Sequence, residues 1–465
     1  MIRTMKRIPV ILLLTTLFAA AAYAQAPVPD SALKKSPKAS ARPVPAAPQV
    51  GAASYIMTDF NSGRVLVEHN ADMRVEPASI TKLMTAYVVF SELADGNINL
   101  QDQVPVSEKA WRTGGSRMFI DPKMQVSVED LVRGMVIQSG NDASVALAEH
   151  IAGSEESFAE LMNHYGETLG MQSTNFRNST GLPDPDHYTT ARDIAVLSAA
   201  TVRDFPDYYT WYSEKEFTFN NIRQHNRNTL LWRDPAIDGL KTGHTEAAGY
   251  CLAASAKRDG MRLVSAVMGS SSESSRASET QTLLNYGFRF FETVQLYQAG
   301  QELARARVWK GLSEEVVLGI ADEVYVTIPR GRYDDLEAQV EMRPQMTAPL
   351  SEGEVVGTIN VKLGDELIAS RELITLGSVE EAGFFGSMMD GLELCFDGLF
   401  SDDEPEEQSE SGIAAFLPLS LSPQGDGPRG QRFRRHRDTY RALARGPVAG
   451  RAGGEYAQQA GQLHQ

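Results

Sequence analysis

The sequence has few cysteines and no excess of positive charge, and each shortage argues against a class of protein. Its 465 residues include two cysteines, Cys251 and Cys395, which lie far apart in the chain. They suggest neither a disulfide framework nor a cysteine metal site, so both are expected to be small, buried, apolar side chains. The formal net charge of -16 argues against nucleic acid as a partner, because phosphate binding needs a basic surface.

The apolar run at the N-terminus, residues 9–21, is too short to span a bilayer comfortably. Three cations, Arg3, Lys6 and Arg7, precede it, and the small-x-small sequence Ala22-Tyr23-Ala24 follows. This order is typical of a cleaved signal peptide over residues 1–24 and predicts export, with an uncleaved N-terminal anchor as the alternative.

Residue periodicity divides the next part of the chain. Six prolines within residues 25–50 predict a semi-extended linker. Two hairpins are predicted from alternating residues, at 53–58 with 64–67 and at 249–256 with 261–268, the second turning at Asp259-Gly260. Helical spacing of apolar residues occurs between them, at 79–94, 126–138 and 143–151. The pattern predicts one α/β or α+β domain over residues 51–293, with helices packed on an antiparallel sheet.

Short β-branched segments after residue 297 predict a small all-β domain over residues 298–378. These segments are 316–318, 324–328, 355–363 and 367–376. Residues 383–400 then carry apolar side chains at helical spacing, which predicts an amphipathic helix. The helix either lies in the bilayer interface or, since its polar face is acidic, docks on its own β domain. The tail over residues 401–465 is predicted to be disordered.

The sequence Ser79-Ile80-Thr81-Lys82 is an S-x-x-K motif at the start of an apolar helix. Spacing of three residues puts both side chains on one helical face. A serine hydroxyl needs an adjacent base to become a nucleophile, and a lysine can be that base when burial or another cation lowers its pKa. A second S-x-x-K, Ser31 to Lys34, lies in the proline-rich linker and is interpreted as chance.

Two further short motifs carry polar groups that suit such a site. Ser139-Gly140-Asn141, in a loop between helical segments, offers a hydroxyl for proton relay and an amide for a carbonyl. Ser173-Thr174-Asn175 has the same pattern, so the tripeptide decides nothing by itself. Lys241-Thr242-Gly243 precedes the second hairpin and is predicted on an edge strand, where its cation and hydroxyl can hold a carboxylate and its glycine lets substrate backbone approach.

The order of the three motifs is more specific than any one of them. S-x-N follows S-x-x-K by about 60 residues and K-T-G follows by about 100 more, which is the motif set of penicillin-binding proteins and class A β-lactamases. With Asp238 to Thr245, Asn285 to Glu292 and Gly383 to Gly386, the sequence resembles the D-alanyl-D-alanine carboxypeptidases of Gram-negative bacteria. The resemblance covers about residues 51–400. It implies a penicillin-binding/β-lactamase-like transpeptidase domain, a β-rich second domain and an amphipathic helix on the periplasmic face of the inner membrane.

The resemblance also implies roles for individual residues. Ser79 would be the acylated nucleophile, Lys82 its general base and Ser139 a helper in proton transfer. The residues implied for substrate binding are Asn141, Lys241, Thr242, Gly243, His244 and Arg227. The backbone N–H groups of Ser79 and His244 would form the oxyanion hole. Peptidoglycan stem peptides and β-lactams are the implied partners, and no metal or organic cofactor is implied.

Three other functions remain open from the sequence. A class A β-lactamase would carry S-D-N and an E-x-x-L-N-like segment, whereas this chain has S-G-N and no such segment between Gly181 and Ala200. A D,D-endopeptidase acting on cross-linked peptidoglycan would use the same site. A catalytically inactive cell-wall scaffold would lack the nucleophile or the base, yet all three motifs are complete.

Overall fold

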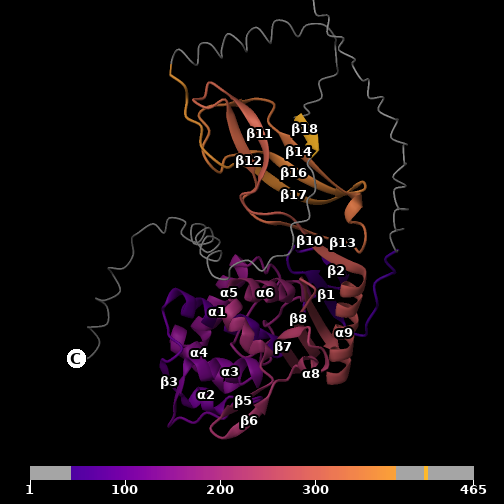
Figure 1. Ribbon diagram of the computed structural model, residues 1–465. Helices are drawn as coiled ribbons and strands as arrows, with labels where there is room; N and C mark the ends of the chain where they lie inside the picture. Colours follow the sequence, from indigo (N-terminus) through magenta and orange to yellow (C-terminus); the bar gives the residue numbers. More distant parts are fainter. Residues whose placement is uncertain (1–42, 384–412, 417–465) are drawn as a thin grey trace, which may run out of the picture. The chain divides into compact units, whose positions relative to one another are not determined.

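The computed structural model describes residues 43–383 and 413–416 (Figure 1). Its N-terminal part is built on a five-stranded antiparallel sheet in the order β2-β1-β9-β8-β7. The strands are β1 (Ser54–Asp59), β2 (Val65–His69), β7 (Ile237–Thr245), β8 (Gly249–Arg258) and β9 (Met261–Ser270). Both predicted hairpins are confirmed, since β1 pairs with β2 and β8 with β9. The K-T-G motif lies on edge strand β7, as predicted.

Helices fill most of the chain between β2 and β7. They are η1 (Ala78–Thr81), α1 (Lys82–Asp95), α2 (Glu108–Arg112), α3 (Val128–Ile137), α4 (Asn141–Ala152), α5 (Glu155–Thr168), α6 (Ala191–Asp204), α7 (Pro206–Tyr209), η2 (Thr210–Ser213) and α8 (Leu230–Arg233). Two small two-stranded antiparallel sheets lie among them, β3 (Gln103–Pro105) with β4 (Gln125–Ser127) and β5 (Glu216–Phe219) with β6 (Ile222–His225). Side-chain caps fix helix starts: Ser127 accepts the Asp130 N–H before α3, and Thr190 accepts the Asp193 N–H before α6.

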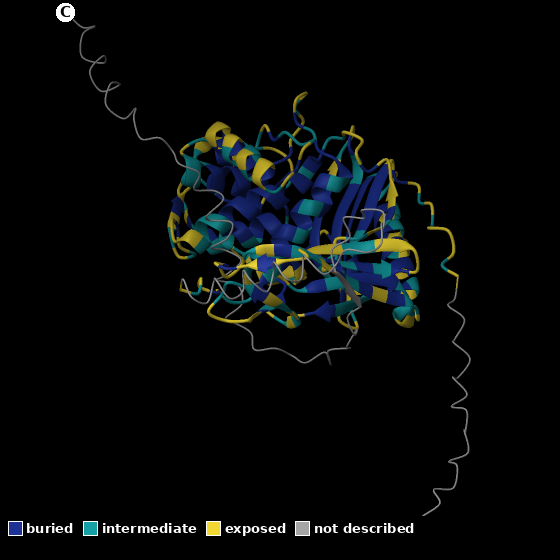
Figure 2. Ribbon diagram, turned by 90° about the horizontal axis from the view of Figure 1, so that it is seen from above, coloured by how far each residue is buried: buried dark blue, intermediate teal, exposed yellow. Residues whose placement is uncertain are grey.

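The sheet separates two apolar cores. Alternate residues of β8 face opposite sides, so Cys251 belongs to the core beneath α1 and α6, whereas Leu252 belongs to the core beneath α9 (Glu273–Phe290). Figure 2 shows the strands and the inner helix faces as a continuous buried body. Burying each large aliphatic side chain contributes about 1.5–3 kcal/mol, so these two cores hold the motif-bearing elements in place. Cys251 is fully buried, as predicted.

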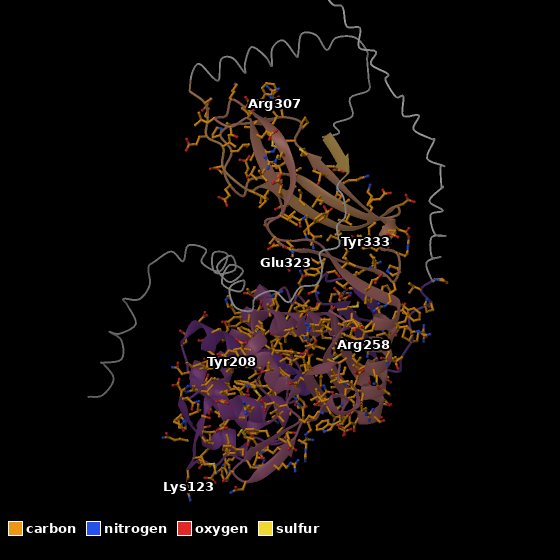
Figure 3. The ribbon with its side chains drawn as sticks, in the orientation of Figure 1. Lys123, Tyr208, Arg258, Arg307, Glu323 and Tyr333 are labelled. Atoms are coloured by element: carbon orange, nitrogen blue, oxygen red, sulfur yellow. The ribbon has the colours of Figure 1, made fainter. Side chains whose placement is uncertain are left out.

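Aromatic and cationic side chains complete the packing around these cores (Figure 3). Tyr208 of α7 stacks on Phe90 of α1 with ring centroids 5.1 Å apart. On the other face of the sheet, the guanidinium of Arg258 lies 4.6 Å from the ring centroid of Phe288 in α9. Both contacts join a helix to a neighbouring element and cover the edge of a core.

The C-terminal part is all-β, as predicted. β10 (Phe291–Tyr297) pairs with β13 (Val324–Pro329), and a second sheet has the order β15-β11-β12-β17-β16-β14-β18. The remaining strands are β11 (Glu302–Trp309), β12 (Glu315–Gly319), β14 (Leu336–Met342), β15 (Met346–Thr347), β16 (Val355–Leu363) and β17 (Glu366–Thr375). The four predicted β segments correspond to β12, β13, β16 and β17, whereas β10, β11, β14 and β15 were not predicted.

Several predicted segments lie outside the described residues, namely the signal peptide, the linker up to residue 42 and the helix over residues 384–400. The end of the predicted linker, residues 43–50, has no regular secondary structure. It is nevertheless docked, because Val44 and Val50 pack on the core beneath α9 and Tyr286 donates to the Pro45 carbonyl at 3.0 Å. Within residues 43–383 and 413–416, no helix has both the length and the apolarity to cross a membrane.

The prediction of a wholly disordered tail is wrong for four residues. β18 (Ile413–Phe416) pairs antiparallel with β14, opposing residues 339–342. The apolar run Ile413-Ala414-Ala415-Phe416 interrupts a polar segment, and β14 would otherwise be an edge of the sheet. An edge strand presents unpaired backbone groups, and a short apolar segment of the same chain can satisfy them.

Candidate active site

The S-x-x-K motif spans the junction between a 3-10 turn and a helix. Ser79 lies in η1, and Lys82 is the first residue of α1, so the α-helix begins one turn later than predicted. Ala78, just before Ser79, has a φ of +47°, which an L-residue rarely adopts and which prevents a regular α-helix from running through it. Ser79 is half-buried and reachable, whereas Lys82 is fully buried.

Lys82 contacts three oxygens. Its Nζ lies 3.1 Å from Ser79 Oγ, 2.6 Å from Asn141 Oδ1 and 2.6 Å from the Thr180 carbonyl oxygen. The amide and carbonyl oxygens can only accept hydrogen bonds, so they take both N–H groups of a neutral amine. The lone pair is then left facing the Ser79 hydroxyl. The two shorter contacts thus orient Lys82 as a base toward Ser79.

Burial lowers the pKa of Lys82 to about 7, because the charged ammonium loses its hydration. The carboxylates of Asp142 and Glu155 oppose this shift by favouring the cation. Neither carboxylate forms an ion pair with Lys82. About half of the lysine is therefore neutral near pH 7, which suits a general base at that pH.

This pKa predicts the pH dependence of acylation. The rate constant for acylation of Ser79 is expected to rise with pH through about 7 and then level off, since only the neutral amine can accept the serine proton. Glu155→Gln removes a charge that favours the ammonium while keeping an oxygen for the Ser179 hydroxyl. In this variant, the rise of the acylation rate with pH should occur at lower pH. Stopped-flow acylation between pH 5 and pH 9 measures both curves, and a limb that stays in place or moves upward would contradict this electrostatic account.

The other two motifs meet at Lys241. Its Nζ lies 2.9 Å from Ser139 Oγ and 3.0 Å from the Thr242 carbonyl oxygen. Ser139 is buried and has a φ of +70°, a strained conformation for a serine. The sheet edge and the loop before α4 therefore place K-T-G and S-x-N in contact, as the sequence predicts.

Positive charge gathers around this pair without a matching carboxylate on Lys241. Burial holds the pKa of Lys241 well below its ordinary value, and the cations of Lys82, Arg276 and Arg227 lower it further. Arg276 of α9 donates to the Gly243 carbonyl at 3.3 Å and pairs with Glu273 at 2.8 Å. Burial thus favours the neutral amine of Lys241, and an anion bound beside it would favour the ammonium again, so this pocket suits an anion.

Gly243 has a structural role in addition to the predicted contact with substrate. A Cβ on this residue would lie 3.1 Å from Ile80 Cγ1, 3.1 Å from the Pro77 carbonyl oxygen and 3.2 Å from Ala78 Cβ. Glycine therefore lets β7 approach η1 closely. This approach holds the K-T-G strand beside the Ser79 turn.

The remaining predicted residues surround this centre. Asn141 uses its carbonyl oxygen for Lys82 and donates to the Gly114 carbonyl at 2.6 Å. The exposed ring of His244 packs on Tyr250 with centroids 4.1 Å apart. Arg227 is exposed and lines a hollow of about 390 Å³ with Gln138 and Glu273.

The second S-x-N tripeptide has a structural role. Ser173-Thr174-Asn175 is an ordinary turn, in which Asp193 accepts the Ser173 N–H at 2.9 Å and the Thr174 hydroxyl at 2.6 Å. Asp193 thus stabilises this turn. The Ser31 motif lies outside the described residues.

Three residues of the site were not found from the sequence. Arg276 has no motif around it, and Thr180 acts through a backbone carbonyl, which any residue has. Asp142 follows the S-G-N tripeptide directly, and its carboxylate accepts the N–H groups of Met118, Phe119 and Ile120. That adjacency is the one signal that could have identified it. Asp142 holds the loop that borders Asn141.

The serine with its oriented amine, next to a buried cation pocket on a sheet edge, has the chemistry of a serine acyl-transfer enzyme. Family models agree in both parts of the chain. Residues 41–272 match the D-alanyl-D-alanine carboxypeptidase family, and residues 291–381 match the C-terminal domain of penicillin-binding protein 5. The chain belongs to the D-alanyl-D-alanine carboxypeptidase family, and the predicted fold, a penicillin-binding α/β domain followed by an all-β domain, is confirmed.

Individual relatives extend this similarity over most of the chain. The D-alanyl-D-alanine carboxypeptidase DacA of Escherichia coli K12 is 45% identical over 402 residues, which are 85% of this chain and 97% of the relative. DacC of the same organism is 48% identical over 358 residues, 75% of this chain and 90% of the relative. The crystal structure of penicillin binding protein 5 from Haemophilus influenzae superposes with a TM-score of 0.70 at 45% identity, covering 72% of this chain and 99% of that one.

Proposed function

We propose that the protein is a serine-type D-alanyl-D-alanine carboxypeptidase that removes the terminal D-alanine of peptidoglycan pentapeptides. The observation that carries this proposal is the contact of Lys82 Nζ with Ser79 Oγ, with both amine hydrogens engaged by other oxygens. Family membership supplies the substrate class, since the relatives are named as carboxypeptidases acting on D-alanyl-D-alanine.

The reaction runs in two steps. Ser79 Oγ attacks the carbonyl carbon between the two D-alanines while its proton passes to Lys82 Nζ. The C–N bond then breaks, the proton goes to the leaving amine, and D-alanine departs from an acyl-serine ester. In the second step water attacks the ester carbonyl and gives a proton to Lys82, which passes it to Ser79 Oγ as the ester C–O bond breaks. The shortened peptide leaves as its carboxylate after releasing the other water proton to solvent. Ser139, whose Oγ lies 2.9 Å from Lys241 Nζ, would pass the proton on toward the leaving amine.

The carboxylate of the substrate fits the cation pocket. Lys241 and Thr242 would hold it, with Arg227 nearby and Arg276 behind Gly243. A substrate carboxylate would supply the counter-charge that Lys241 lacks and would favour its ammonium form. Asn141 would position the peptide, and the N–H groups of Ser79 and His244 would bind the oxyanion as it develops. β-Lactams carry a carboxylate and a reactive amide in the same relation, so they would acylate Ser79 by the same attack.

Two further activities use the same chemistry. A D,D-endopeptidase would cleave the D-alanyl bond of a cross-link, and a β-lactamase-like hydrolase would turn over penicillin. No specific contact favours either over carboxypeptidase action. Cell location follows from the family and the predicted signal peptide: we expect a periplasmic enzyme attached to the outer face of the inner membrane through residues 384–400.

Three substrates tested in parallel separate these activities. The purified full-length protein is incubated with diacetyl-Lys-D-Ala-D-Ala, with a cross-linked muropeptide dimer and with benzylpenicillin. We expect D-alanine release from the tripeptide and a benzylpenicilloyl group on the peptide containing Ser79, detected by mass spectrometry. Faster cleavage of the dimer than of the tripeptide would establish an endopeptidase, and rapid penicillin turnover without an accumulating adduct would establish a β-lactamase.

A further inference from the structure

The buried imidazole of His187 touches the S-x-x-K turn from outside the three motifs. His187 is 3% exposed, and its Nε2 lies 3.0 Å from Thr81 Oγ1. Thr81 lies within the turn that joins Ser79 to Lys82. The imidazole therefore contacts the residue directly next to the lysine, and its ring nitrogens form no hydrogen bond with Ser79 or Lys82.

Thr81 Oγ1 also packs against the loop that orients Lys82. Gly181 adopts a φ of +81°, and a Cβ there would lie 2.8 Å from Thr81 Oγ1 and 1.8 Å from the Ala78 carbonyl oxygen. Gly181 directly follows Thr180, whose carbonyl oxygen accepts from Lys82 at 2.6 Å. Thr81 is thus enclosed by the Thr180–Gly181 loop and by the His187 ring. Fixing Thr81 fixes the distance between the S-x-x-K turn and the carbonyl that orients the base.

The second ring nitrogen of His187, Nδ1, lowers the stability of the folded protein. His187 Nδ1 is buried and has no hydrogen-bond partner among the described residues. An unpaired buried polar atom costs about 1–3 kcal/mol, so a leucine of similar size would serve packing better. Edge-to-face packing on Phe176, with centroids 5.8 Å apart, needs only an apolar ring. Stability alone gives no reason for a histidine here, which leaves its bond to Thr81 as the reason.

Burial favours the neutral form of the ring. Burial lowers the pKa of His187 to about 4, and the cations of Arg177 and Lys82 lower it while Asp184 opposes them. At neutral pH the ring therefore adds no charge beside Lys82. An uncharged bond to Thr81 can hold the turn without changing the charge on the base.

We propose that His187 is a positioning residue for acylation. Through Thr81 it holds the Ser79–Lys82 turn against the Thr180–Gly181 loop. This contact keeps water away from the Lys82 amine and keeps the amine oriented toward Ser79. The inference rests on the proposed roles of Ser79 and Lys82. Without the bond, the loop can separate from the turn and water can reach Lys82. The rate of acylation then falls, and the pKa of the rehydrated lysine rises.

The test uses four variants of the full chain. His187→Leu and Thr81→Val each remove the bond and keep the volume, whereas His187→Gln retains an amide group near the position of Nε2. His150→Leu is the matched control, because His150 also has a buried ring nitrogen without a partner but lies in the last turn of α4. Benzylpenicillin acylation of Ser79 is followed by stopped flow from pH 5 to pH 9, and melting temperature is measured on the same samples.

We expect about tenfold slower acylation for His187→Leu and Thr81→Val. In both variants the pH at which the acylation rate rises should move upward. The melting temperature of His187→Leu should be no lower than that of the unmodified protein. Their double variant should be no slower than either single one, His187→Gln should stay within about threefold of normal, and His150→Leu should be normal. Unchanged acylation in His187→Leu, additive losses in the double variant, or a glutamine variant as slow as leucine would each overturn the proposal. If the unmodified protein acquires no adduct at Ser79, the proposed function itself fails, and the inference with it.

Discussion

Replacing Ser79 with alanine is expected to lower D-alanine release by at least about 10⁴-fold and to abolish covalent labelling by penicillin. The hydroxyl oxygen is the atom that bonds to the substrate carbon, and no neighbouring group can replace it. Lys82 and Ser139 remain in Ser79→Ala, so substrate binding should persist. D-alanine release and mass spectrometry of the penicillin-treated protein measure the two losses.

The sequence provides a matched control for this variant. Ser31 begins the other S-x-x-K sequence of the chain, so Ser31→Ala makes the same chemical change outside the site. It should leave release and labelling unchanged. Release that persists in Ser79→Ala would show that another residue is the nucleophile, and a loss in Ser31→Ala would mean that the linker motif takes part in the reaction.

Gly181→Ala is expected to lower the free energy of unfolding by more than about 3 kcal/mol, a large loss for a single added methyl group. The left-handed conformation of Gly181, with φ of +81°, costs about 1–2 kcal/mol for any residue with a Cβ. A Cβ would also lie 1.8 Å from the Ala78 carbonyl oxygen and 2.4 Å from its carbon. Backbone atoms cannot swing aside, so the Thr180 loop or the Ser79 turn must move. Urea unfolding followed by circular dichroism measures the loss.

Gly153 separates the two contributions. It has a φ of +77°, and a Cβ there meets nothing within 4 Å, so Gly153→Ala carries the conformational cost without the collision. We expect a loss of about 1–2 kcal/mol and normal acylation for this variant. Gly181→Ala should also slow acylation, because Thr180 orients Lys82. Equal losses of stability in the two variants would show that the collision at Gly181 is relieved at no cost.

The motifs were predictable from sequence because each is a short run whose chemistry depends on residue type. Ser79, Lys82, Ser139 and Lys241 were found in this way, and the structure brings them into contact. Thr180 acts through its carbonyl oxygen, and His187 acts on a residue 106 positions away. Contacts of these kinds depend on how the loops return to the turn, and no local pattern encodes them.

The strands also differ in whether a local sequence pattern marks them. Hairpin strands β8 and β9 are marked by apolar runs around Asp259-Gly260. In β14, only the alternate residues Leu336, Ala338 and Val340 are buried. The strand has a single β-branched residue, Val340, and the residues between the buried ones are polar, so no β pattern marks it. β18 was hidden by its surroundings, because composition averaged over the whole tail outweighs four apolar residues.

The buried amine of Lys241 links occupancy of the site to the stability of the whole domain. Without a ligand, burial and the nearby cations hold this amine away from its charged form, and unfolding would return it to water. A bound carboxylate pairs with the amine and binds the folded state alone, so it raises the melting temperature by mass action. Even a peptide that cannot be cleaved should therefore protect the protein against heat if it keeps its terminal carboxylate, and its C-terminal amide should protect much less. The pocket that selects the end of a peptide thus also lets that peptide stabilise the folded enzyme.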